Sequence, residues 1–276
     1  MDKYEIRHQF AAYVARPDAD IALDMAALLI AAESEPDLDI DLYLDFLDQT
    51  AARFKADVDD RTHLDISVTS LYDFIYQAEG FSGNIKNYYE PRNSYLNHVI
   101  NTHQGIPITL ALIHICLGRR LQIPVHGISF PGHFLVRYGQ EKQVIVDPFS
   151  GRVLSETDCS TLLKQIAGPR AVLRPEYFEV ATNKSILIRI LDNLKQIFWR
   201  SQAWDESKGC IERQLLLIPE RQEFNVQLGA VYERQGRIDL AQHTYALVLE
   251  ACQDPDIKIL ASKRLIAMGT SKPVIH

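Results

Sequence analysis

The spacing of hydrophobic residues predicts helices across the first eighty positions. One set of apolar side chains recurs at helical intervals and forms a single stripe: Tyr43, Phe46, Leu47, Ala51 and Phe54. A second stripe runs from Leu71 to Ala78, and its helix is expected to end at Gly80 or at the Gly83-Asn84 pair, because glycine commonly terminates helices. Residues 1–83 are therefore predicted to be a helical region.

The pattern then predicts a loop, a short helix and a long helix. Residues 84–93 are expected to form the loop, and the short helix runs from about Ser94 to His103. Gly105-Ile106-Pro107 opens the longer helix, since a proline in the first helical turn has no hydrogen bond to lose. The break at Gln122-Ile123-Pro124 is expected to end it.

Beyond that break the period changes from helical to alternating. Three short runs rich in β-branched and aromatic residues are predicted to be antiparallel strands: Val125–Ser129, Phe134–Tyr138 and Gln143–Val146. Residues 147–151 read as a turn, and another helix is expected from about Ser155 to Ala167. Helices followed by a small sheet define an α+β front domain, residues 1–182, with its motif core at 84–182.

From Asn183 onward the chain is predicted to be all helical, and a repeat of 34 residues is visible. Five positions of the first unit align with five of the second: Leu194, Phe198, Ser207, Ile211 and Pro219 with Leu228, Tyr232, Ala241, Tyr245 and Gln253. The second unit is close to the tetratricopeptide pattern. Residues 183–276 are therefore expected to form tetratricopeptide-type hairpins followed by a last helix, Ile257–Met268.

Charge and cysteine content limit the expected partners and the expected cellular compartment. The 276 residues carry a net charge of −7, which disfavours nucleic acid as a partner because phosphate binding needs a basic surface. The four cysteines are widely spread and suit a reducing compartment. The first residues are too charged for a secretory signal, and no apolar run is long enough for a membrane span. A cytoplasmic protein is expected.

Three segments carry a resemblance to a known family. They are Tyr88-Tyr89-Glu90-Pro91-Arg92-Asn93-Ser94-Tyr95-Leu96, Gly105-Ile106-Pro107-Ile108-Thr109-Leu110 and Phe130-Pro131-Gly132-His133-Phe134-Leu135-Val136. The chain resembles the bacterial SirB-type family, in which a transglutaminase-core-like domain precedes tetratricopeptide repeats. The resemblance covers roughly residues 10 to 265 and implies a transglutaminase- or papain-like fold.

The resemblance implies a role for each motif position. In transglutaminase-like enzymes a cysteine at a helix N-terminus is the nucleophile, a histidine takes its proton, and an aspartate orients the imidazole. Carried over to this chain, His133 matches the base and Asp147 the orienting acid. Pro107 stands at the nucleophile position, and its pyrrolidine ring cannot attack a substrate.

Other side chains are weak substitutes for the missing nucleophile. Cys116 lies nine residues beyond Pro107, which turns it to the opposite helix face and about 13 Å along the axis, as a core cysteine would be. Cys159 falls outside the motif and is interpreted as structural. Thr109 lies about 200° around the helix from Pro107, and its hydroxyl is expected to bond the helix start or the adjacent loop.

Neither a metal nor a cofactor is expected. His98 and His103 are five residues apart, outside the spacing that places two ligands on one helix face, and His114 and His126 fall on different elements. The acidic run at 37–41 is interpreted as a helix start matched to the helix dipole.

Asn97 precedes the motif helix and, with Pro107, Thr109 and His133, is assigned to a binding cleft. The alternative for this segment is structural: Asn93 or Ser94 caps the short helix and the tyrosines pack beneath it.

The loss of the cysteine with the fold retained favours a non-catalytic scaffold. The cleft would bind a protein or peptide, and the tetratricopeptide tail would add a docking surface. One alternative is a hydrolase or acyl-transfer enzyme in which His133 and Asp147 activate water or a substrate hydroxyl. Another is an interaction protein whose cleft is filled by its own side chains.

Overall fold

The computed structural model describes residues 2–59, 68–140 and 143–269. It divides the chain into two compact units, Met1–Ile190 and Leu191–His276. The division falls inside helix α8 (Asn183–Arg200), whose first residue is the expected domain boundary. Residues 60–67, within the expected helical region, lie outside the described residues.

The first unit begins with helices, as the hydrophobic stripes predict. The bounds of the first three are α1 (Lys3–Val14), α2 (Leu23–Ala32) and α3 (Ile40–Asp59). The predicted stripe of α3 is confirmed, because Leu47, Ala51 and Phe54 are buried. α2 is apolar on nearly every side, which is typical of a helix enclosed by others. Within the described ranges, no helix has both the length and the apolar character that a membrane crossing requires.

The segment before the motif helix contains short elements. Helix α4 (Val68–Asp73) continues into a π-helical turn, η2 (Phe74–Ala78), and a 3₁₀ turn, η3 (Pro91–Ser94), precedes α5 (Leu96–Thr102). The expected helix from Ser94 to His103 is therefore shorter at both ends. The segment also contains two strands of two residues each, β1 (Ser82–Gly83) and β2 (Gln104–Gly105), which pair in parallel.

The motif helix and the sheet follow the predicted order. Helix α6 (Pro107–Leu121) starts with proline and ends where Gln122 adopts a left-handed conformation, with φ of 57°. Four antiparallel strands follow in the order β3-β4-β5-β6. Their bounds are β3 (Val125–Ile128), β4 (Leu135–Tyr138), β5 (Val144–Asp147) and β6 (Arg152–Leu154). The first three were expected, whereas β6 was not.

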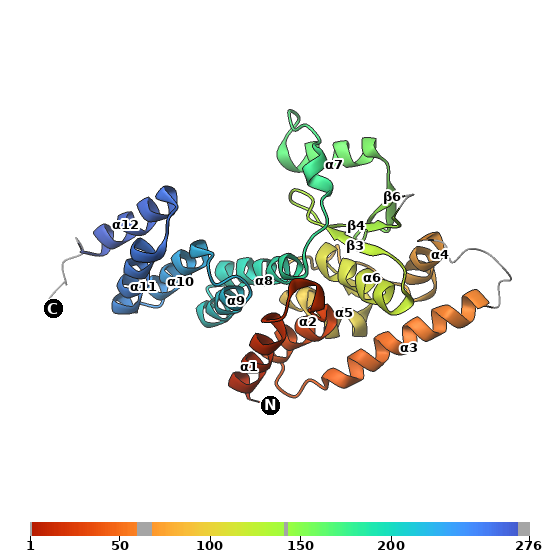
Figure 1. The fold of residues 1–276 in the computed structure, drawn as a ribbon, viewed down its shortest axis with the longest axis horizontal. Helices are drawn as coiled ribbons and strands as arrows, with labels where there is room; N and C mark the ends of the chain where they lie inside the picture. The colour runs from red at the N-terminus through yellow and green to blue at the C-terminus, as the bar shows by residue number, and fades with distance from the viewer. Residues whose placement is uncertain (1, 60–67, 141–142, 270–276) are drawn as a thin grey trace. The chain divides into compact units, whose positions relative to one another are not determined.

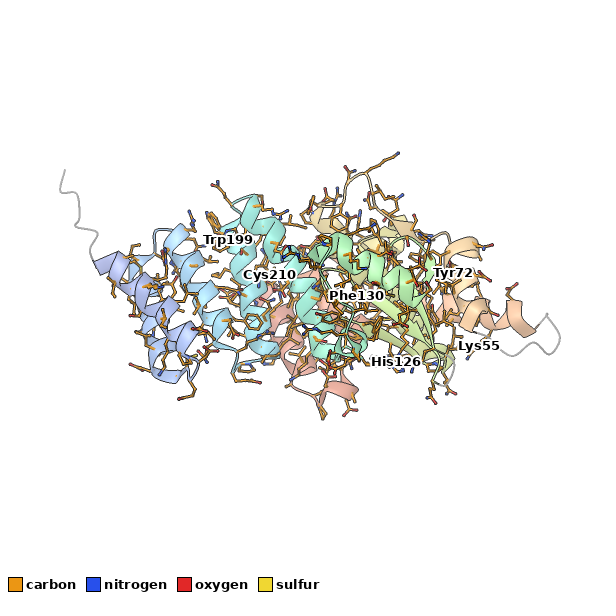
Figure 2. The ribbon with its side chains drawn as sticks, turned by 90° about the horizontal axis from the view of Figure 1, so that it is seen from above. Lys55, Tyr72, His126, Phe130, Trp199 and Cys210 are labelled. Atoms are coloured by element: carbon orange, nitrogen blue, oxygen red, sulfur yellow. The ribbon has the colours of Figure 1, made fainter. Side chains whose placement is uncertain are left out.

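The sheet is covered on both faces. Helix α6 lies on one side of β3 and β4, and α7 (Glu156–Ala167) lies on the other (Figure 1). On the α6 side the packing is close: a methyl group on Gly118 would lie 2.5 Å from the Val125 side chain. On the α7 side, Phe130, labelled in Figure 2, belongs to an apolar cluster with Cys159 and Leu163. The segment that includes η4 (Pro175–Phe178) completes this layer.

The second unit is built from successive helices. After α8 they are α9 (Trp204–Leu217), α10 (Gln222–Arg234), α11 (Ile238–Ala251) and α12 (Pro255–Gly269). Both ends of α11 lie 34 residues after those of α9, as the sequence repeat predicts. Helices α10 and α11 approach closely, because a methyl group on Gly229 would lie 2.8 Å from the ring of Tyr245.

Candidate functional site

His133 and Asp147 meet at one end of the four-stranded sheet. Nε2 of His133 lies 2.8 Å from Oδ1 of Asp147, and the two side chains are 15% and 12% exposed. The two residues that the family resemblance pairs as base and orienting acid are therefore in contact. The hydrogen bond to Asp147 uses Nε2. The other ring nitrogen, Nδ1, does not bond Asp147.

The strand register explains why these two residues meet. Val136 of β4 pairs with Val146 of the antiparallel β5, so the start of β4 and the end of β5 share one edge of the sheet. His133 lies just before β4 in a tight turn. The backbone N–H of His133 donates to the Phe130 carbonyl. Gly132 has φ of +67° in this turn, a conformation that glycine adopts without strain.

The carboxylate of Asp147 is held by three donors. Oδ1 accepts from His133 and from the backbone N–H of Phe149 at 2.9 Å, and Oδ2 accepts the Ser150 hydroxyl at 2.7 Å. Burial would raise the pKa of Asp147, but these hydrogen bonds and the nearby imidazole together hold the pKa below its usual value. Asp147 is therefore a fixed anion that orients the His133 ring.

Pro107 is the buried first residue of α6, at the position that the resemblance gives to the nucleophile. The strand pair Gly83–Gly105 stands just before it. A methyl group on Gly83 would lie 2.6 Å from the carbonyl oxygen of Phe149, which is two residues beyond Asp147. The start of α6 and the turn after Asp147 are thus linked through Gly83.

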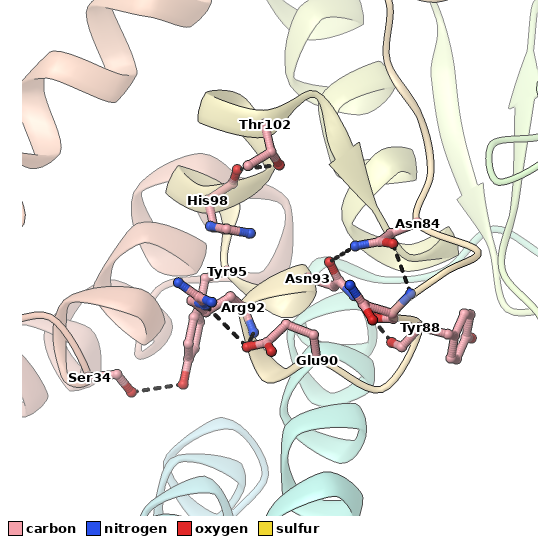
Figure 3. Close-up of polar contacts among 10 residues, drawn as sticks. Ser34, Asn84, Tyr88, Glu90, Arg92, Asn93, Tyr95, His98 and Thr102 are labelled. Atoms are coloured by element: carbon pink, nitrogen blue, oxygen red, sulfur yellow. Dashed lines mark hydrogen bonds and ion pairs between the residues drawn. The ribbon is translucent and has the colours of Figure 1, made fainter.

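Thr109 serves the helix start and the loop, as expected. Its hydroxyl donates to the Asn93 carbonyl at 2.7 Å and accepts the backbone N–H of Ile106 at 3.2 Å. Asn93 in turn holds the loop together, as Figure 3 shows. Its side chain accepts from Asn84 at 3.0 Å and donates to the Tyr88 carbonyl at 3.3 Å. Because its hydroxyl is used in this way, Thr109 fits a structural role.

Asn97 has its partner in the N-terminal helical region. Its side-chain nitrogen donates to Glu35 at 2.8 Å, and the residue is buried. The structure thus joins Asn97 to Glu35, and no hydrogen bond of the described residues joins it to His133 or Asp147. The assignment of Asn97 to a shared cleft stays a prediction.

The structural alternative for the tyrosine segment is wrong for the helix cap and for Tyr88 and Tyr89, whereas Tyr95 is buried as it predicts. Tyr95 is the N-cap residue of α5, and no side chain caps that helix by a hydrogen bond. The side chain of Asn93 bonds loop carbonyls instead. Tyr88 and Tyr89 are 39% and 65% exposed, so they do not pack beneath the helix. Tyr88 contacts the Phe149 ring edge-on, with 5.6 Å between centroids.

The two cysteines weighed as substitute nucleophiles are buried. Burial raises the pKa of Cys116 far above that of a free thiol. In α7, burial and the nearby Asp158 and Glu156 raise the pKa of Cys159 to about 11. Both thiols are therefore protonated at neutral pH, which agrees with their structural interpretation.

A buried network behind the site was not foreseen from the sequence. The hydroxyl of Tyr76 lies 2.9 Å from Nε2 of His114 and donates to the Pro148 carbonyl at 3.0 Å. Nδ1 of His114 bonds the hydroxyl of Tyr138. Burial lowers the pKa of His114 to about 3, so its ring is neutral. The sequence signal for this network was His114, a polar residue among the apolar residues of α6.

Two pockets of the first unit lie away from the His133–Asp147 pair. One, of about 570 Å³, is lined by β5, β6, Cys159 of α7 and Phe178. The other, of about 370 Å³, is bordered by Arg119, His126 and Asn183. Neither is lined by His133, Asp147 or Pro107. The site is therefore defined by its hydrogen bonds, not by either of these hollows.

Comparison with known proteins identifies the class. The profile of the transglutaminase-like superfamily matches residues 41–192, a stretch that contains Pro107, His133 and Asp147. The chain belongs to this superfamily.

Bacterial relatives narrow the family. The chain is 35% identical over 224 residues to a UPF0162 protein of Xylella fastidiosa, an alignment that covers 79% of this chain and 80% of that one. It therefore belongs to the UPF0162 family. A UPF0162 protein of Vibrio cholerae is 28% identical over 204 residues, with 73% and 76% covered.

A more distant relative is eukaryotic. Human F-box only protein 21 is 25% identical over 175 residues, which cover 59% of this chain and 27% of that protein. No solved structure matches the chain significantly.

Proposed function

We propose that this protein is a non-catalytic, transglutaminase-like scaffold that binds a protein or peptide. The observation that carries the proposal is Pro107, a buried proline at the helix start to which the family resemblance assigns the nucleophile. A thiol there would have its pKa lowered by the helix dipole and by the neighbouring imidazole. A proline offers no nucleophile, and it suits the first helical turn structurally.

The retained His133–Asp147 pair fits a binding role. Asp147 fixes the ring through Nε2, which leaves Nδ1 to accept or donate a hydrogen bond to a bound segment. Tyr88 and Tyr89, exposed on the loop next to Phe149, provide aromatic surface of the kind that is enriched in protein interfaces. A polypeptide segment is therefore the proposed ligand of the cleft.

The second unit is proposed to be a tetratricopeptide-type docking surface. The recurrence of the helix bounds after 34 residues and the close approach of Gly229 to Tyr245 support this assignment. Repeats of this type present extended surfaces to protein partners. The net charge of −7 disfavours nucleic acid as the partner, and we place the scaffold in the cytoplasm.

An enzyme is the second candidate, favoured by the geometry of the pair. An imidazole oriented by a carboxylate at 2.8 Å is the arrangement of a general base. In that case His133 would activate water or a substrate hydroxyl for hydrolysis or acyl transfer.

One experiment separates the two candidates. Wild-type protein and His133→Gln are compared for turnover of amide and ester substrates, and for quantitative protein capture from a native lysate by mass spectrometry. The scaffold predicts no turnover that depends on His133, together with at least one captured protein that the variant retains about tenfold less. Turnover that His133→Gln abolishes would instead establish the enzyme.

A further inference from the structure

The turn that follows Asp147 is held at both ends by tyrosine hydroxyls. Tyr76 donates to the carbonyl of Pro148 at 3.0 Å, and Tyr72 donates to the carbonyl of Gly151. The two tyrosines are four residues apart in the helical segment of α4 and η2, so they share one face. Their ring centroids are 5.0 Å apart. Residues 148–151 are thus clamped from outside the sheet.

The same turn supplies the donors that fix the Asp147 carboxylate. The backbone N–H of Phe149 and the hydroxyl of Ser150 both bond Asp147, at 2.9 and 2.7 Å. The ring of Tyr76 packs directly on the turn, because a methyl group on Gly151 would lie 3.0 Å from it. A shift of this turn would therefore rotate the carboxylate that faces His133.

Tyr76 is itself anchored to His114 in the core. The number of available hydrogens defines which group donates in each hydrogen bond of the Tyr76 hydroxyl. Its single hydroxyl hydrogen goes to Pro148, so it must accept from Nε2–H of His114. Nδ1 of His114 is then the acceptor for the Tyr138 hydroxyl. A continuous chain of hydrogen bonds thus runs from β4 through α6 to the turn, with every member satisfied.

We propose that Tyr72 and Tyr76, anchored through His114, are positioning residues that hold Asp147 against His133. Among the described residues, no hydrogen bond or ring contact joins either tyrosine to the imidazole, so they act through the turn 148–151. The inference rests on the proposed function in one respect: the His133–Asp147 pair must be the functional centre.

The test uses single hydroxyl deletions in the full chain. Tyr76→Phe and Tyr72→Phe remove one donor each and keep the ring. Tyr95→Phe is the matched control, because Tyr95 is a buried tyrosine whose hydroxyl bonds Ser34 at 2.8 Å, in the N-terminal helical region. The pKa of the Asp147 carboxyl is followed by carbon NMR, and His133→Gln defines the rise expected when the imidazole is lost.

Tyr76→Phe is expected to produce at least half of the rise seen in His133→Gln, and Tyr72→Phe a smaller one. Tyr95→Phe should lose stability without moving the Asp147 pKa. A pKa that both turn variants leave unchanged, while His133→Gln raises it, would overturn the positioning role alone. If His133→Gln itself has no effect, the pair is uncoupled and the proposed function fails. Should Tyr76→Phe not fold, Tyr72→Phe decides the question by the same readout.

Discussion

Nε2 of His133 lies 2.8 Å from Oδ1 of Asp147, and the same oxygen also accepts the backbone N–H of Phe149. This shared acceptor ties the imidazole to the turn that follows β5. The orientation of His133 therefore depends on the backbone of this turn as well as on the aspartate.

Asp147→Asn should lower stability most at neutral pH. The pKa of Asp147 is held below its usual value, so its charge stabilises the fold above the unfolded-state pKa of about 4 and this contribution is lost as pH falls. Denaturant unfolding is expected to show a loss of about 1.5–3 kcal/mol at pH 7. The difference from wild type should shrink at pH 3, and an equal difference at both values would contradict the assignment.

His114 predicts a second acid effect in a different pH window. Burial lowers its pKa to about 3, so below about 6.5 the unfolded chain binds a proton that the folded chain does not. Wild-type stability should therefore fall by up to about 1.4 kcal/mol per pH unit from this group between pH 6 and 3. His114→Leu should remove that slope although it is less stable at pH 7.

Exposed His8 supplies the control for this measurement. His8→Gln replaces an exposed imidazole, and its unfolding is measured over the same pH range. A constant difference between wild type and His114→Leu across pH 6 to 3 would show that His114 does not titrate as described.

Gly229→Ala tests the helix approach in the second unit. Its new methyl group would lie 2.8 Å from the ring of Tyr245, whose hydroxyl is held by Glu233 at 2.7 Å, so the ring cannot move freely. Overpacking of this kind costs about 1–3 kcal/mol, which exceeds the gain of up to about 1 kcal/mol in helix propensity. A lower midpoint in denaturant unfolding is expected.

Gly269→Ala is the matched helical control, because none of the residues that the structure describes lies within 4 Å of its added methyl group. It should be neutral or slightly stabilising. If Gly229→Ala behaves in the same way, α10 and α11 are not packed as closely as the structure indicates.

The longer elements could be predicted because their periodicity extends over many residues. Helix α6 begins at the expected Pro107, and the first three strands of the sheet were expected within one or two residues. Strands of two or three residues, such as β1, β2 and β6, have no period to detect. They form because neighbouring segments bring a pairing edge to them.

The site was only partly predictable for a similar reason. The family resemblance singled out His133 and Asp147, but the bonds of Tyr76 join it to residues 38 and 72 positions away. Local pattern carries no information on such contacts. The alternative that Asn93 or Ser94 caps the short helix was wrong, because Tyr95 is the N-cap residue and the Asn93 amide bonds loop carbonyls instead.

The central claim is that Pro107 occupies the nucleophile position beside His133. Pro107→Cys, made alone and with His133→Gln, is alkylated over a range of pH, and each thiol is followed by mass spectrometry. The account predicts that the introduced thiol has a pKa below the usual value of about 8.5, is alkylated faster than Cys116, and has a higher pKa when His133 is replaced. An introduced thiol that titrates at the usual value, or identically in both backgrounds, would contradict it.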